Sequence, residues 1–153
     1  MSNFFISRIR FGTWLGLFFL ICFVGLTRAA AADPKLEVQL VWGTNGESSP
    51  DKNHKALDPA LAKKLGMFKW KKYFTVNREE ISLTPHGAQK IRLSPQCEVE
   101  IKQIEGPRYE INVFGKGKHV RKIIEKITKE DSLVIAGDDK NDCAWIILIR
   151  EIK

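Results

Sequence analysis

The chain has 153 residues, with 25 Lys or Arg, 18 Asp or Glu and a formal net charge of +7 at pH 7. Arg8, Arg10 and Arg28 precede residue 33 and every acidic residue follows residue 32, so residues 33–153 have 22 basic and 18 acidic residues, a net charge of +4. A charge this small excludes a dedicated nucleic-acid-binding protein. The length after residue 32 suits one domain with a single core, and the sequence contains no internal repeat.

Residues 1–30 predict a secretory signal sequence. Arg8 and Arg10 form a positive segment, an apolar run extends from Phe11 to Leu26, and alanines at 29–32 provide small residues for cleavage. The alternative is an uncleaved anchor, because this run of about 16 residues falls just short of the roughly 17 to 25 needed to span a bilayer. We therefore expect an exported protein, periplasmic or extracellular, with one β-rich domain at residues 33–153. Membrane contact is expected only if the segment is retained.

The first elements of this domain are a strand and a long loop. Residues 36–42 alternate apolar and polar side chains with period two, which predicts a core strand with its apolar residues on one face. Residues 43–57 consist mainly of Gly, Asn, Ser, Pro, Asp and Lys, with almost no apolar residue before Ala56. Such a segment buries too little apolar area to order itself, so we expect an exposed loop.

A short helix is predicted next. Asp58 is a favourable N-cap, and Pro59 suits the first helical position because its missing N–H is not needed there. Lys63 and Lys64 complement the negative end of the helix dipole, and Gly66 can adopt the left-handed conformation that ends a helix. These signals predict a helix of roughly two turns.

Aromatic and basic residues then alternate at residues 68–74, the densest mixture of the two in the chain. Stacking faces between lysines suit a glycan or an anionic polymer. The alternative is a half-buried strand that points its aromatic rings inward and its lysines outward, without any ligand. If a binding surface exists we expect it here, beside the loop at 43–57, with an anionic envelope polymer, a glycan or a protein as partner. The predicted binding residues are Lys69, Trp70, Lys71 and Lys72.

The rest of the chain predicts short strands joined by turns. The run at 119–127 suits a helix or a strand, and its isoleucines favour a strand. Residues 144–149 are apolar on both faces, which indicates a central strand covered on both sides. The predicted fold is a mostly β antiparallel sandwich with one short helix, and a small β-barrel is the second choice. The predicted strands cover residues 73–77, 81–83, 89–93, 97–104, 109–114, 119–127, 132–136 and 143–152, with a turn at Glu79 and Glu80 between the first two.

Cys97 and Cys143 are the cysteines that follow the signal segment. In an oxidising compartment they are plausible disulfide partners, and a bridge over this separation would stabilise the fold by roughly 4 kcal/mol in the loop-entropy treatment. Two buried thiols are the alternative. We favour the disulfide slightly over two free thiols. It requires the two Cα atoms to lie within about 7 Å of each other.

No catalytic or metal-binding motif stands out. The histidines are widely separated, no cysteine pair has zinc-ligand spacing, and the acidic residues at 138–142 suit a turn better than a calcium loop. We expect no metal and no cofactor. The sequence therefore favours a small exported β-domain with a non-catalytic binding or structural role in the cell envelope or outside the cell. The alternative is a secreted hydrolase or inhibitor whose site is assembled from loops, with His54, His86 or His119 meeting Asp138, Asp142 or a serine.

Overall fold

The computed structural model describes residues 33–49, 51–139 and 142–152. Asp33–Lys153 form one compact unit. The predicted signal sequence, residues 1–30, lies outside the described residues. Within the part that is described, no helix has both the length and the apolar character that crossing a membrane requires.

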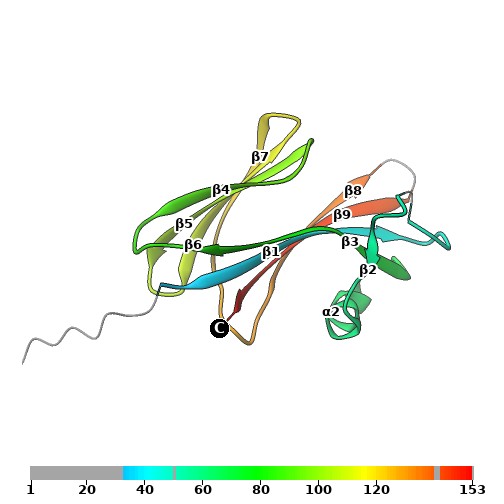
Figure 1. Ribbon diagram of the computed structural model, residues 1–153, viewed down its shortest axis with the longest axis horizontal. Helices are drawn as coiled ribbons and strands as arrows, with labels where there is room; N and C mark the ends of the chain where they lie inside the picture. The colour runs from blue at the N-terminus through cyan, green and yellow to red at the C-terminus, as the bar shows by residue number, and fades with distance from the viewer. Residues whose placement is uncertain (1–32, 50, 140–141, 153) are drawn as a thin grey trace, which may run out of the picture. The chain divides into compact units, whose positions relative to one another are not determined.

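The strands form two antiparallel sheets (Figure 1). Within the described residues neither sheet closes into a barrel, and the predicted mostly β sandwich is confirmed. The four-stranded sheet is a meander in which each strand pairs with the next along the chain. It contains β4 (Ala88–Ser94), β5 (Cys97–Glu105), β6 (Arg108–Gly115) and β7 (Lys118–Lys126). The five-stranded sheet contains, in spatial order, β2 (Lys55–Ala56), β3 (Lys72–Ser82), β1 (Lys35–Thr44), β9 (Cys143–Ile152) and β8 (Leu133–Asp139).

The core has two layers, one on each face of the five-stranded sheet. The inner layer lies between the two sheets, where Leu40 of β1 and Ile147 of β9 pack in one cluster with Val99 and Ile111 of the other sheet. The outer layer packs residues of β1, β3 and β9 against the short helix. Successive residues of β9 alternate between the layers: Ile147 belongs to the inner one and Ile146 to the outer one. The prediction that this strand is covered on both sides is confirmed.

The predicted helix is present as α2 (Pro59–Lys64), and its N-terminal signals act as expected. The Asp58 carboxylate accepts hydrogen bonds from the backbone N–H groups of Ala60, at 2.9 Å, and Leu61, at 3.3 Å. The C-terminal prediction is wrong, because the chain continues into a 3-10 turn, η1 (Leu65–Met67), and Gly66 does not have a positive φ. Buried Leu65 explains the tighter turn: its carbonyl accepts a hydrogen bond from the Tyr73 hydroxyl at 2.8 Å.

Two other local predictions need correction. The turn expected at Glu79 and Glu80 is absent, since β3 continues to Ser82 and pairs with β1 throughout. β2 pairs with β3 only at residues 74 and 75, so Glu79 and Glu80 lie where β3 is the sheet edge. Charged residues are common on exposed edge strands because they discourage edge-to-edge association. The loop expected at 43–57 is also shorter, because β1 extends to Thr44 and β2 occupies two of its residues.

The disulfide predicted between Cys97 and Cys143 does not form in the structure. Cys97 begins β5 in the four-stranded sheet, and its side chain packs against the inner layer of the core. Cys143 begins β9 in the five-stranded sheet, and its thiol lies 3.7 Å from the Thr44 hydroxyl. The two cysteines are therefore held by different sheets and by different neighbours.

Candidate binding groove

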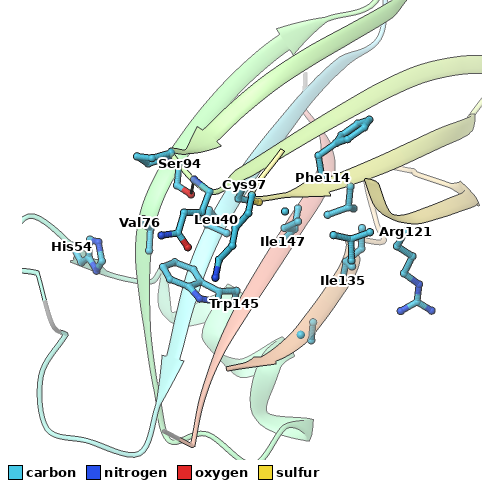
Figure 2. A pocket seen from close by; sticks show the side chains of 18 of the residues that line it. Leu40, His54, Val76, Ser94, Cys97, Phe114, Arg121, Ile135, Trp145 and Ile147 are labelled. Carbon is cyan, nitrogen blue, oxygen red and sulfur yellow. Dashed lines mark hydrogen bonds between the residues drawn. The ribbon is translucent and has the colours of Figure 1, made fainter. Parts of the chain in front are cut away.

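The two sheets diverge towards one end (Figure 1). A groove of about 800 Å³ is lined by residues of both sheets (Figure 2). The five-stranded sheet provides Val76, Leu40, Trp145 and Ile147, together with Ile135–Gly137 of β8. The four-stranded sheet provides residues 94–97 of the β4–β5 turn, residues 113–116, and Val120 and Arg121 of β7. Most of this lining is apolar, and open apolar clefts with few polar groups are typical of small-ligand sites.

The floor of the groove follows from the strand register. Trp145 of β9 lies opposite Trp42 of β1, and the two indoles meet edge to face with centroids 4.6 Å apart. On its other side Trp145 lies opposite Gly137 of the edge strand β8. A Cβ added at Gly137 would have no atom within 4 Å, so the space beside the indole is open. As a result 38% of Trp145 is exposed, although it lies on the face that forms the inner core.

The opposite wall depends on two tight turns. Lys116 and Gly117 connect β6 to β7 and both have positive φ, at 51° and 75°, as a two-residue type I′ hairpin turn requires. The backbone N–H of Lys116 donates to the carbonyl of Gln96 in the β4–β5 turn, at 2.9 Å. Val120 lies over Gly115, where an added Cβ would come within 3.1 Å of its side chain. The two turns are thus linked, and Val120, 65% exposed, presents apolar surface to the groove.

Charged groups lie at the two ends of the groove. His54 is at one end and Arg121 at the other, with Trp145, Ile147 and Ile135 between them (Figure 2). Asp51 lines the groove with His54, and Lys116 lines it on the four-stranded sheet. Within the described residues neither Lys116 nor Arg121 forms an ion pair, whereas Lys90 and Lys122 on the outer face of the same sheet are paired with Glu98 and Glu110, each at 2.8 Å.

The loop at 49–54 brings a serine, a histidine and an aspartate together. The Ser49 hydroxyl lies 2.6 Å from Nδ1 of His54, and Nε2 of His54 lies 4.0 Å from a carboxylate oxygen of Asp51. A catalytic triad requires a hydrogen bond at the second contact as well, and 4.0 Å is too long. Asp51 instead accepts from the backbone N–H of Asn53 at 2.8 Å, and Ser49 does not line the groove. This arrangement mainly orders the loop.

The other histidines do not join this loop. His119 is on the outer face of the four-stranded sheet, where it contacts Asn112 at 3.2 Å. His86 is exposed in the turn between β3 and β4, with a φ of 59°. Among the side chains that the structure describes, the convergence predicted for a hydrolase is therefore limited to His54 and Ser49. Among the residues that the structure describes, no cluster of three or more His, Cys, Asp or Glu side chains could hold a metal ion.

Cys97 is the thiol in the groove. Burial raises its pKa, and the negative charge of neighbouring Glu98 raises it further. A raised pKa keeps the sulfur protonated at neutral pH, and only the thiolate is a strong nucleophile. The groove thus offers a weakly polar lining at Cys97 instead of a covalent site.

None of the four residues predicted to bind from sequence lines the groove, and Trp70 packs on the other face of the five-stranded sheet. Trp70 is 7% exposed, belongs to the outer layer of the core and donates its indole N–H to the carbonyl of Asp142 at 3.0 Å. This agrees with the alternative of inward aromatic rings and outward lysines. Lys69, Lys71 and Lys72 are exposed, with Lys69 2.9 Å from Asp142 and Lys72 donating to the Glu47 carbonyl at 3.0 Å. Ligand binding by these lysines stays a prediction.

The acidic turn supports the fold at this same place. Asp142 has a φ of 55°, and its carboxylate accepts from Asn45 at 3.0 Å. Hydrogen bonds from Lys69 and then Asn45 lower the pKa of Asp142. The contact between Asp142 and Trp70 joins the β8–β9 turn to the aromatic segment.

Sequence reasoning did not find the groove. Its walls come from strands far apart in the chain. The sequence predicts that the strand beginning at residue 132 ends at Ala136 and that Gly137 belongs to a turn, whereas β8 continues to Asp139 and places Gly137 opposite Trp145. One signal was present in the sequence. Trp145 is a large apolar residue near the start of β9, where the cover that both faces of the rest of this strand receive can end. Comparison with protein-family models, with curated proteins and with solved structures finds no match for this chain.

Proposed function

We propose that this protein is an exported, non-catalytic binding domain that holds the hydrocarbon part of a small ligand in the groove between its sheets. The observation that carries the proposal is the open groove of about 800 Å³ with a partly exposed tryptophan at its floor. Burial of apolar ligand surface there would contribute roughly 25 cal/mol per Å² before the costs of association.

The chemistry of the lining favours binding over catalysis. Cys97 is kept protonated by its raised pKa, and the contact between His54 and Asp51 is too long for a triad. Export rests on the sequence of residues 1–30 and is part of the proposal. Intact mass of the protein from an exporting host tests it: loss of about 30 residues is the expected result, and a full-length mass would indicate a retained segment.

A groove-filling substitution tests the binding site. Gly137→Phe places a ring in the open space beside Trp145, where an added Cβ meets no atom within 4 Å, so the fold should persist. We expect the variant to lose binding of a decyl-chain ligand, measured by calorimetry or by tryptophan fluorescence. Ala88→Phe is the matched control, because Ala88 is exposed on the edge strand β4 and does not line the groove. Equal binding by both variants would place the ligand elsewhere.

One observation favours a second candidate, a hydrolase that uses Ser49. It is the 2.6 Å contact between the Ser49 hydroxyl and Nδ1 of His54. A nitrophenyl ester assay tests this directly, with Ser49→Ala as the variant and Ser48→Ala as the control. Turnover that disappears only in Ser49→Ala would support the hydrolase, and absence of turnover in the unmodified protein would remove it.

A further inference from the structure

We propose that the ligand is a monomeric linear amphiphile with an anionic head group, and that Arg121 and Lys116 bind this head. The inference rests on the proposed binding function and adds the chemical class and the orientation of the ligand. Its basis is the distribution of charge along the groove: Arg121 at one end, the Asp51 carboxylate beside His54 at the other, an apolar middle between them, and Lys116 on the four-stranded sheet.

The shape of the floor suits a linear chain. The groove crosses β3, β1, β9 and β8, which are neighbours in that order. Strands are spaced by roughly 4.8 Å, so the floor from Val76 to Ile135 spans about 14 Å. Leu40 and Ile147 are buried below it, while Trp145 and Val120 present apolar surface to its opening. An extended alkyl chain fits such a trough better than a compact ring system does.

The two cations can reach a head group because the fold does not neutralise them. Arg121 is exposed on β7, and its register partner is Val113, a buried residue of the inner face. Lys116 is held by its turn, through the positive φ and the hydrogen bond to Gln96. Neither forms an ion pair within the described residues, although other basic residues of this sheet are paired across strands. Charge-assisted hydrogen bonds from an arginine and a lysine are well suited to a carboxylate, a sulfate or a phosphate.

The acidic end of the groove fixes the direction of the ligand. Asp51 repels an anion, so the head would lie at the Arg121 end and the methyl end of the chain near Val76 and His54. The positive charges of Arg121 and Lys116 would repel the head group of a cationic amphiphile. The groove should therefore distinguish ligands with the same chain and different head charge.

The test uses three probes with one chain length: decanoate, decanol and decyltrimethylammonium, each below its critical micelle concentration. Calorimetry with the full chain should show decanoate binding about tenfold more tightly than decanol, with decyltrimethylammonium weakest. In the double variant Lys116→Asn, Arg121→Gln, decanoate affinity should fall about tenfold, to that of decanol, while decanol affinity stays unchanged. Asn is chosen at residue 116 because it tolerates positive φ.

Lys118→Gln, Lys126→Gln is the matched control, because it removes the same net charge from β7 at residues that do not line the groove. It should keep the preference for decanoate. Equal binding of all three probes that is lost in Gly137→Phe would overturn the head-group inference and leave the binding proposal intact. No binding of any probe would remove both. A last outcome is that the protein does not bind decanoate but co-sediments with phosphatidylglycerol vesicles, and that Gly137→Phe still co-sediments. This result would assign the two cations to a lipid surface and would also overturn the inference.

Discussion

Gly137 of β8 lies directly opposite Trp145 of β9, and the missing side chain at Gly137 leaves the indole open to the groove. A glycine within a strand weakens the strand, because it has more conformational freedom to lose and no side chain to pack. Its presence beside an exposed tryptophan is explained if the open space serves a ligand.

Gly137→Val should therefore stabilise the fold and weaken binding. A β-branched residue suits a strand, and it would pair with Trp145 across the ladder, so we expect a gain of roughly 0.5–1 kcal/mol in the free energy of unfolding. Urea unfolding measures the gain, and calorimetry with decanoate measures the loss of affinity. A stabilised variant with unchanged affinity would show that the ligand does not occupy this space.

Loss of the helix cap should destabilise the outer layer. Asp58→Ala removes the acceptor for the N–H groups of Ala60 and Leu61, and we expect a cost of about 1 kcal/mol in urea unfolding. Asp131→Ala is the control at an exposed position, and its effect should stay within about 0.5 kcal/mol. An equal effect of the two substitutions would mean that the cap contributes nothing.

Stability should fall in acid. Hydrogen bonds from Lys90, Lys122 and Lys69 lower the pKa values of Glu98, Glu110 and Asp142, respectively. Carboxyl groups with a lower pKa in the folded state stabilise it above their unfolded pKa, about 4.3 for Glu and 3.9 for Asp, and this contribution is lost as the pH falls through the folded pKa.

Urea midpoints at pH 6 and pH 3 measure this dependence. Asp142 is exposed and Glu98 and Glu110 are partly exposed, so the individual contributions are modest. The double variant Lys90→Met, Lys122→Met should show a smaller difference between the two pH values than the unmodified protein does. An unchanged difference would mean that these pairs are not responsible for acid sensitivity.

Cys97 should react slowly with iodoacetamide. Burial and then Glu98 raise its pKa, so the thiolate fraction near pH 8 should be below that of an ordinary cysteine with a pKa of about 8.5. Peptide mass spectrometry as a function of pH gives the rate at this residue. Glu98→Gln should move the rate profile to lower pH, and decanoate should slow the reaction because Cys97 lines the groove. If Cys97 were labelled rapidly, at a rate that decanoate does not change, the placement of Cys97 in the ligand-binding groove would be contradicted.

Local signals allowed much of the fold to be predicted. Alternation placed the strands, and Asp58 and Pro59 placed the start of α2, because these patterns depend on neighbours within a few residues. The errors in β3 and at Gly66, two of those corrected above, have tertiary causes. β3 is an edge where it carries Glu79 and Glu80, and Leu65 is drawn into the core by Tyr73.

The candidate site could not be predicted in the same way. The mixture of aromatic and basic residues at 69–72 predicted a binding surface. Trp70 instead packs against Gly43, where an added Cβ would lie 3.4 Å from the Trp70 ring. The groove joins Leu40, Val120 and Trp145, which are distant in sequence, and its existence depends on where the two sheets diverge. That divergence is a property of packing, and no single segment encodes it.

The central claim is that ligand binds between the sheets, and amide chemical-shift mapping tests it most directly. A decanoate titration of isotope-labelled protein should shift the resonances of Ile135, Gly137, Trp145 and Ile147, and the Lys69→Ser, Lys71→Ser, Lys72→Ser variant should respond in the same way. Shifts confined to residues 69–72, or shifts that vanish in that triple variant and persist in Gly137→Phe, would contradict the account.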